Sequence, residues 1–406
     1  MKRVKRRAGG IPPAREPPCD LARRPLPAHR RKTAADSAAV HRLDGDAGAG
    51  KGVADRSDRS ASASVLHARR LLRFLKEHRA TLTPLLILTH DFPDPDAIAS
   101  AFALQHLAQS VFGIETKITY GGIVGRTENR AMVRILRIRM HRFHPVLLRR
   151  HAHVAVVDTQ PGFNNNPFPG NRKPAIVLDQ HPADHEPEAG LALVDAECGA
   201  TCVLVAQALL QTGADIPARV ATALAYGILT DTQDLYRARR PDVAQTYLQV
   251  LPHADMRALA RIQNPVRPRR FFSVLGRGIR EAVLYRRLIV THLGPVDTPD
   301  RVSQVAEFLL TYRQAHWCFA TGRFRGRLHA SLRTIRQDAQ AGEVLRDVFE
   351  KRHAAGGHGP IAGGSCRVGV DAPEEKWDER ERLLAERLIR RLRIPARCGP
   401  RRPFAN

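Results

Sequence analysis

Apolar residues recur along the chain with two different periods, and the alternation of these periods predicts the secondary structure. Helical spacing is present in residues 65–78, a short apolar run follows at 85–90, and helical spacing returns at 96–112. The same alternation continues with strands expected at 114–122, 153–159 and 174–181 and helices expected at 128–138, 200–213 and 218–232. Short Val/Ile/Leu strands alternating with helices are typical of a parallel sheet with helices on both faces, so we expect an α/β domain over residues 66–240.

A different pattern follows this first domain. Residues 241–282 are helical and basic, and we expect them to form a helical linker. Strand-like runs, helices and a glycine-rich loop at 354–364 predict a second, smaller α/β domain over residues 283–395. Residues 1–65 are rich in Pro, Gly, Ala, Ser and Arg without a sustained apolar period, which predicts a disordered basic tail. The end of the chain, 396–406, is expected to be a short tail.

Length and charge narrow the class of protein. A chain of 406 residues suffices for two domains, and it has neither an uncharged apolar run of about 18 residues nor a signal-peptide pattern. We therefore expect a cytoplasmic protein without a membrane partner. The formal net charge of +25 makes single-stranded nucleic acid a candidate partner, because basic surfaces attract phosphates. Residues 1–60 hold fifteen Lys/Arg against seven Asp/Glu, and a compositional bias of the whole chain explains the same charge.

Carboxylates recur where apolar segments end, at Asp94, Asp96, Asp158, Asp179 and Asp231. Ligand sites of open parallel sheets lie beyond the carboxyl ends of the strands. An Asp after a strand is commonly a helix N-cap, which is the structural explanation for each of these residues alone. Several carboxylates on one sheet edge, however, repel one another unless a cation neutralises them. Oxygen ligands together with His90 indicate manganese or magnesium.

The segment HDFPDPD, residues 90–96, contains three of these candidate metal ligands. Pro93 and Pro95 block a helix and favour an extended loop with defined side-chain directions. A rigid loop of this kind can present His90, Asp94 and Asp96 to one metal site.

At these residues the chain resembles the DHH superfamily of phosphoesterases. HDFPDPDAIAS, VVDTQP, VLDQH and GILTDT look like the four motifs of that family, in order. In the second domain, SLR (331–333) and AAGGHGPIAGG (354–364) look like the DHHA1 substrate-binding domain. The resemblance covers about residues 66–394 and is greatest to the oligoribonuclease and phosphoadenosine-phosphate phosphatase group. It implies a parallel-sheet DHH domain joined by a helical linker to a smaller α/β DHHA1 domain.

The resemblance also implies roles for single residues. In the family pattern one manganese ion is held by His90 and Asp94, a second by Asp96 and Asp231, and both by the bridging Asp158. Two ions about 3.5–4 Å apart activate water and clamp the phosphoryl oxygens. His181 would then contact the phosphate or assist the leaving oxygen, with Asp179 as a buried supporting acid.

The second domain is expected to hold the substrate. Gly356 and Gly357 let backbone N–H groups approach an anion, and His358 follows them. Arg333 can offer its planar fork to a phosphate. Glycine-rich segments are also often plain turns, so this expectation depends on the neighbouring SLR motif.

One position departs from the family pattern. Gln180 stands where the first histidine of the Asp-His-His motif ligates the second metal ion. A neutral amide is a poorer ligand for a transition metal than imidazole, so we expect weak binding of the second ion. His181 and His185 are the candidates to replace it.

These observations predict a manganese-dependent phosphoesterase that hydrolyses short oligonucleotides, or nucleotides such as phosphoadenosine phosphate, by two-metal activation of water. The first alternative is a nucleotide-binding regulator with weakened catalysis, because of Gln180. The second is a processive single-strand exonuclease, although that branch usually carries a further nucleic-acid-binding domain, and none is visible after residue 394. The identity of the substrate and the oligomeric state stay open.

Overall fold

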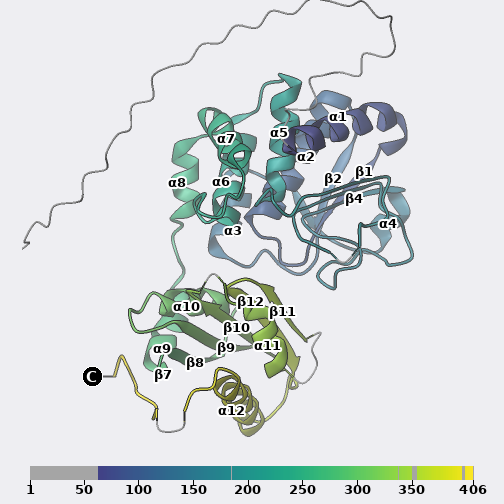
Figure 1. Ribbon diagram of the computed structural model, residues 1–406. Helices are drawn as coiled ribbons and strands as arrows, with labels where there is room; N and C mark the ends of the chain where they lie inside the picture. Colours follow the sequence, from purple (N-terminus) through teal and green to yellow (C-terminus); the bar gives the residue numbers. More distant parts are fainter. Residues whose placement is uncertain (1–62, 184, 337, 350–353, 396–397, 406) are drawn as a thin grey trace, which may run out of the picture. The chain divides into compact units, whose positions relative to one another are not determined.

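The first lobe, residues 63–263, is built on a six-stranded parallel sheet. The computed structural model describes residues 63–183, 185–336, 338–349, 354–395 and 398–405, and this sheet has the strand order β3-β2-β1-β4-β5-β6 (Figure 1). The strands are β1 Leu85–Thr89, β2 Thr116–Tyr120, β3 Met140–Arg142, β4 His153–Val157, β5 Ile176–Asp179 and β6 Leu191–Val194. Every neighbouring pair is parallel, which confirms the expected α/β class.

The strand register brings the candidate site residues to one edge of this sheet. Thr89 on β1 pairs with Val157 on β4, so the residues that follow them, His90 and Asp158, leave the sheet side by side. Strand β5 lies next to β4 and ends at Asp179. Because the strands run in the same direction, these three side chains share the carboxyl edge, where open α/β sheets bind ligands.

Both faces of this sheet are covered. The helices of the lobe are α1 Ala63–Leu82, α2 Pro95–Phe112, α3 Thr127–Ile135, α4 Val146–Arg150, α5 Thr201–Thr212 and α6 Ala218–Thr232. Leu85 and Ile87 of β1 pack in one core with buried residues of α1, α2, α5 and α6. Leu86 and Leu88 point to the opposite face, because successive side chains of a strand alternate, and pack there near α4 and Phe168.

The segment predicted as a linker contributes to both lobes. It contains α7 Pro241–Val250, a 3₁₀ turn at Leu251–His253, α8 Met256–Gln263 and α9 Arg269–Arg280. Val243 and Leu259 are buried in the core of the first lobe. Ile279 on α9 packs against a core of the second lobe. The helical character was predicted, whereas the packing of these helices into two cores comes from the tertiary structure.

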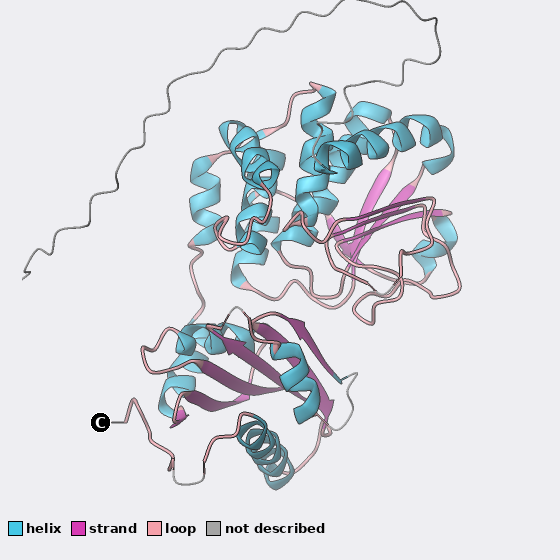
Figure 2. Ribbon diagram, in the orientation of Figure 1, coloured by secondary structure: helices cyan, strands magenta, loops and turns pink. Residues whose placement is uncertain are grey.

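The second lobe, residues 269–405, has a mixed six-stranded sheet in the order β11-β12-β10-β9-β8-β7 (Figure 2). Its strands are β7 Val283–Tyr285, β8 Leu288–Pro295, β9 Trp317–Phe324, β10 Arg327–Thr334, β11 Ala355–His358 and β12 Ile361–Arg367. Among the described strand pairs of this sheet, only β8 and β9 are parallel. The helices are α10 Asp300–Leu310, α11 Ala341–Val348 and α12 Glu374–Arg391.

The glycine-rich segment predicted as a loop is instead a β-hairpin, which corrects that expectation. Gly356 on β11 is paired with Gly363 on β12. The glycines permit close packing here, since a Cβ on Gly342 of α11 would lie only 2.2 Å from the carbonyl oxygen of Gly357. Glycine content alone does not distinguish such a tightly packed strand from a turn.

The end of the chain is ordered against the second sheet. The main-chain N–H of Leu284 on β7 donates to the oxygen of Arg401 at 2.7 Å, and the reverse bond is 3.1 Å. Phe404 packs edge-on against Tyr312, with ring centroids 5.1 Å apart. This part of the predicted tail therefore covers a strand edge.

Most of the basic tail predicted at the other end, residues 1–62, lies outside the described residues. Within the described part of the chain, no helix is both long and apolar enough to cross a membrane.

Candidate metal centre

The loop between β1 and α2 holds the first candidate ligands. Asp94 is the N-cap of α2, and its Oδ1 accepts the backbone N–H of Ala97 at 3.0 Å. The loop is braced from outside, because Asn129 Nδ2 donates to the carbonyl oxygen of Pro93 at 3.1 Å. His90 Nδ1 lies 2.8 Å from the carbonyl oxygen of Asp91, which can only accept, so Nδ1 carries the proton. Nε2 of His90 faces Asp94 and Asp158.

Asp158 follows β4 in a left-handed backbone conformation, with φ 58°. Its carboxylate is almost fully buried, and Oδ1 accepts the hydroxyl of Thr201 at 2.7 Å. Oδ2 has no hydrogen-bond partner among the described residues. His90 Nε2 lies 3.5 Å from this oxygen, within ion-pair distance. A buried carboxylate oxygen without a hydrogen bond is costly and calls for a cation.

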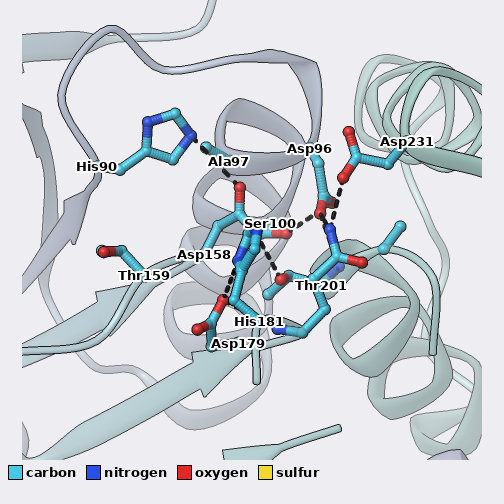
Figure 3. A network of polar contacts seen from close by, with 12 residues as sticks. His90, Asp96, Ala97, Ser100, Asp158, Thr159, Asp179, His181, Thr201 and Asp231 are labelled. Carbon is cyan, nitrogen blue, oxygen red and sulfur yellow. Dashed lines mark hydrogen bonds and ion pairs between the residues drawn. The ribbon is translucent and has the colours of Figure 1, made fainter. Parts of the chain in front are cut away.

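His90, Asp94 and Asp158 converge on one point. Each offers a ligand atom, and these atoms lie within 4.8 Å of one another. His90 Nε2 is 3.8 Å from Asp94 Oδ1. Figure 3 shows the ring of His90 directed at the carboxylate of Asp158. The structure thus brings together three of the residues predicted as metal ligands.

A second group lies on the other side of Asp158. His181 Nδ1 is 2.8 Å from Asp179 Oδ1 and 3.9 Å from Asp158 Oδ1 (Figure 3). Gln160 Nε2 donates to Asp179 Oδ2 at 2.8 Å and to the carbonyl oxygen of His181, also at 2.8 Å. Asp179 is thereby fixed from both sides, and it orients the ring of His181.

The pKa values of these groups are shifted by burial and by one another's charges. Burial alone lowers the pKa of His90, but pairing with the charges of Asp158 and Asp94 raises it well above its ordinary value. Burial raises the pKa of Asp94, yet the bond and charge of His90 outweigh it and lower the pKa to about 2. Burial raises the pKa of Asp158, with the charge of Asp94 adding to the effect. Burial lowers the pKa of His181, but Asp179 and Asp158 raise it to about 9.

The first group of residues fits a divalent cation. Its donors are an imidazole nitrogen and two carboxylates, the ligand types that manganese and magnesium sites in proteins use. The unsatisfied Oδ2 of Asp158 is the independent sign that a cation belongs there. His90 is also oriented by a second bond through Nδ1, as metal-binding histidines usually are.

The residues expected to hold a second ion are arranged differently. Asp96 is fully buried and Asp231 lies near the end of α6. Figure 3 shows the two carboxylates directed toward the same point. Gln180 Nε2 occupies that point, 3.2 Å from Asp96 Oδ2 and 2.5 Å from Asp231 Oδ2. Neither acid belongs to a group of three His, Cys, Asp or Glu ligands in the described part of the chain.

One cavity is lined both by His181 of the second group and by residues predicted to hold substrate. Its volume is about 2070 Å³. The predicted residues on its lining are Gln180, His181, Asp231, Arg333, Gly356 and Gly357. The side chain of His358 lies outside the described residues, although its backbone belongs to β11.

The guanidinium group of Arg333 is held by hydrogen bonds within the protein. Its Nη1 donates to the carbonyl oxygens of Leu332 and Ala362 at 3.1 and 2.9 Å, and its Nε donates to Glu307 Oε1 at 3.3 Å. The guanidinium group is therefore fixed in direction and remains on the lining of the cavity. Its part in substrate binding stays a prediction.

Sequence reasoning missed two residues that shape the centre. Gln160 belongs to the VVDTQP motif, and its position directly after a predicted strand could have identified it as a residue of the site. Thr201 begins α5 and gave no such signal, because its partner Asp158 is 43 residues away in the sequence. Contacts of that kind are set by how the helices pack on the sheet.

This fold and site define a class: a parallel α/β lobe with a histidine and carboxylate centre at the carboxyl edge of its sheet. Residues 84–228 match the DHH family, N-terminal domain, so the chain carries a domain of the DHH family.

The similarity of this chain to two other proteins extends beyond this domain. Uncharacterized protein MJ1633 of Methanocaldococcus jannaschii is 31% identical over 326 residues, which are 79% of this chain and 66% of that protein. This chain therefore spans only about 66% of its relative. The crystal structure of an exopolyphosphatase-related protein from Bacteroides fragilis is similar with a TM-score of 0.59 at 15% identity, over 80% of this chain and 98% of that one. This second likeness shows a shared fold.

Proposed function

We propose that this protein is a divalent-metal-dependent phosphoesterase that hydrolyses phosphoester bonds of nucleotides or short oligonucleotides. One observation carries the proposal. His90, Asp94 and Asp158 place three potential metal ligands within 4.8 Å of one another, and Asp158 contributes a buried carboxylate oxygen without a hydrogen bond among the described residues. The DHH-family domain supports the same chemistry.

The residues of the centre have different roles in this reaction. A divalent ion bound there neutralises the carboxylates and polarises a phosphoryl oxygen. Asp179 holds Nδ1 of His181 and so fixes the direction of its ring, which places Nε2 as the proposed donor to the substrate. In the hydrolysis a water oxygen forms a bond to phosphorus and releases one proton to the solvent, while the ester P–O bond breaks and the leaving oxygen takes the proton from His181 Nε2. The solvent then returns a proton to His181, so that the cycle balances.

A nucleotide substrate is the finer part of the proposal. The cavity is large enough for more than a phosphate group, and exposed aromatic side chains lie on its lining, including Phe92 and Tyr236. Aromatic faces stack on nucleobases. Arg333, Gly356 and Gly357 are the proposed contacts to a phosphate, in a domain we propose to be of the DHHA1 type. Manganese as the metal and a cytoplasmic location remain predictions from the sequence.

A nucleotide-binding regulator is the second candidate, and one observation favours it. The amide of Gln180 stands among acids where the family pattern has a metal-ligating histidine. Calorimetry together with a turnover assay separates the two candidates. Tight nucleotide binding without product supports the regulator, and product formation supports the enzyme.

The test of the proposal uses the purified full chain with manganese. The substrates are a dinucleotide, phosphoadenosine phosphate, a cyclic dinucleotide and inorganic polyphosphate. We expect manganese-dependent hydrolysis of at least one nucleotide and none in the presence of a chelator. Hydrolysis of polyphosphate alone would contradict the nucleotide substrate, and no turnover on any of the four would contradict the enzyme.

A further inference from the structure

The amide group of Gln180 connects two carboxylates that the family pattern assigns to a metal ion. Its nitrogen lies 3.2 Å from Asp96 Oδ2 and 2.5 Å from Asp231 Oδ2. An amide nitrogen has two N–H donors, and carboxylate oxygens accept them, so each acid takes one donor. The oxygen end of the amide, which could ligate a cation, does not make these contacts.

The carboxylate of Asp96 has no acceptor site left for a metal ion. Oδ1 accepts the N–H of Cys202 at 2.8 Å and the hydroxyl of Ser100 at 3.3 Å. Oδ2 accepts the N–H of Thr201 at 2.6 Å in addition to the amide of Gln180. A carboxylate offers about four acceptor positions, and all four of these are used.

The environment of Asp96 compensates its charge without a cation. The two backbone donors begin α5, where the helix dipole favours negative charge. Asp96 therefore serves as a buried cap of a helix that is distant in the sequence. Asp158 is the opposite case, because its Oδ2 has no hydrogen-bond partner among the described residues.

We propose that the centre holds a single divalent ion, at His90, Asp94 and Asp158, and that the amide of Gln180 takes the place of a second ion. The neutral NH₂ group joins Asp96 to Asp231 by hydrogen bonds instead of by a metal. This inference rests on the proposed metal site and adds the number of ions. The two-ion arrangement expected from the family resemblance does not fit these residues.

The experiment counts metal ions in the folded chain. Purified protein is equilibrated with manganese chloride by dialysis, and bound manganese per chain is measured by elemental analysis. We expect one ion per wild-type chain. The variant Gln180→Glu replaces the amide by a carboxylate of the same shape, which leaves three acids at the point now occupied by the NH₂ group. Such a set of oxygen ligands attracts a hard cation, so we expect two ions per chain.

The control variant is Gln207→Glu. Gln207 is also a buried glutamine, but its amide donates to the hydroxyl of Thr246 and not to a carboxylate. The same change of charge there should leave one ion per chain. A second ion in this control would mean that any added buried carboxylate recruits manganese, which contradicts the special role of Gln180.

A second measurement does not depend on metal binding. The variant Gln180→Met removes both N–H donors at similar volume and leaves the carboxylates of Asp96 and Asp231 without their common partner. In chelator-treated protein at neutral pH we expect a lower melting temperature than for the wild type. An unchanged melting temperature would contradict the hydrogen-bonded bridge.

The outcomes separate this inference from the proposed function. Two ions on the wild-type chain overturn the inference and leave the phosphoesterase proposal standing. No ion on the wild-type chain overturns the metal site on which both rest. One ion on both the wild type and folded Gln180→Glu overturns the assignment of Gln180 to the place of the second ion.

Discussion

At the scale of the single residue, Asp158 combines an unusual backbone with an unusual side chain. Its φ of 58° lies in the left-handed region that few residues other than glycine adopt, although Asp and Asn are enriched there. Its Oδ1 is satisfied by Thr201, and its Oδ2 has no hydrogen bond within the described residues. Such strain and unsatisfied polarity are kept where function requires them.

Replacing this carboxylate tests the metal site directly. Asp158→Asn keeps the acceptor for Thr201 and tolerates the same backbone, but it loses the charge that attracts a cation. We expect manganese affinity to fall at least about tenfold, which corresponds to about 1.4 kcal/mol, and hydrolysis to be lost. Calorimetry gives the affinity, and circular dichroism shows that the variant is folded.

Asp242 offers a matched control for this change. It is also buried, and its Oδ2 also lacks a hydrogen-bond partner in the described part of the chain, but it lies on α7. Asp242→Asn should leave manganese affinity unchanged. An equal loss in both variants would show that the effect is one of general stability.

His181 is the residue placed to protonate a leaving group, and the reactivity of the substrate reveals that role. In His181→Gln we expect hydrolysis of a dinucleotide to fall by about 10²–10⁴-fold, the usual contribution of a general acid. A p-nitrophenyl phosphodiester has a leaving group that needs no proton, so its hydrolysis should fall much less. Steady-state rates on both substrates provide the measurement.

The exposed His185 serves as the control in the same loop. His185→Gln should change neither rate. Equal losses on both substrates in His181→Gln would mean that His181 positions the phosphate and does not protonate the leaving oxygen.

At the scale of the elements, the centre depends on how closely α6 approaches α2. A Cβ on Gly227 of α6 would lie 2.9 Å from the Cβ of Ala99, 3.0 Å from Cys202 Sγ and 3.2 Å from the oxygen of Pro95. These distances leave no room for a methyl group without movement of a helix. The glycine therefore sets the spacing that brings Asp231 toward the acids of α2.

Substitution of this glycine should separate the two helices. We expect Gly227→Ala to lower the free energy of unfolding by about 1–3 kcal/mol, because overpacking exceeds the gain in helix propensity. Urea denaturation measures the change. Gly276 on α9 is the control, since a Cβ there would meet only the flexible end of Arg280 at 3.4 Å. Gly276→Ala should be neutral or stabilising by up to about 1 kcal/mol, and a comparable loss in it would contradict the packing argument.

At the scale of the whole molecule, the described residues belong to one compact unit that holds every residue predicted for the site. The basic segment 1–60 contains none of them. Its fifteen Lys/Arg residues are suited to the attraction of nucleic acid, an effect that weakens as salt rises.

Deletion of residues 1–60 therefore separates small-substrate chemistry from nucleic-acid binding. We expect nearly unchanged hydrolysis of a dinucleotide, because a substrate of that size reaches the centre without the tail. Binding of single-stranded nucleic acid should weaken and lose part of its salt dependence. Rates and a salt titration of binding, each compared with the full chain, test both parts, and a large loss on the dinucleotide would place the segment in the active site.

Much of the fold followed from local patterns. The apolar segment 85–90, the helix at 96–112 and the helix at 218–232 were predicted from their periods, and the structure has them with small shifts of the ends. The short strands β3 and β6 were not predicted, because three or four residues carry too little periodicity. Both lie at the edges of the sheet, where burial is weaker.

The site was determined by the sequence in part. Parallel strands place their carboxyl ends at one edge, so acids that follow successive strands meet whatever the details of packing, and His90, Asp94 and Asp158 do so. The direction of a side chain among them is a different matter. The amide of Gln180 is bonded to acids 84 and 51 residues away, and Asp96 is capped by donors 105 and 106 residues away. The sequence identified these groups as candidates for the site. Hydrogen bonds act only over about 3 Å, so only the tertiary structure decided which of these groups bond to one another and which are left for a metal ion.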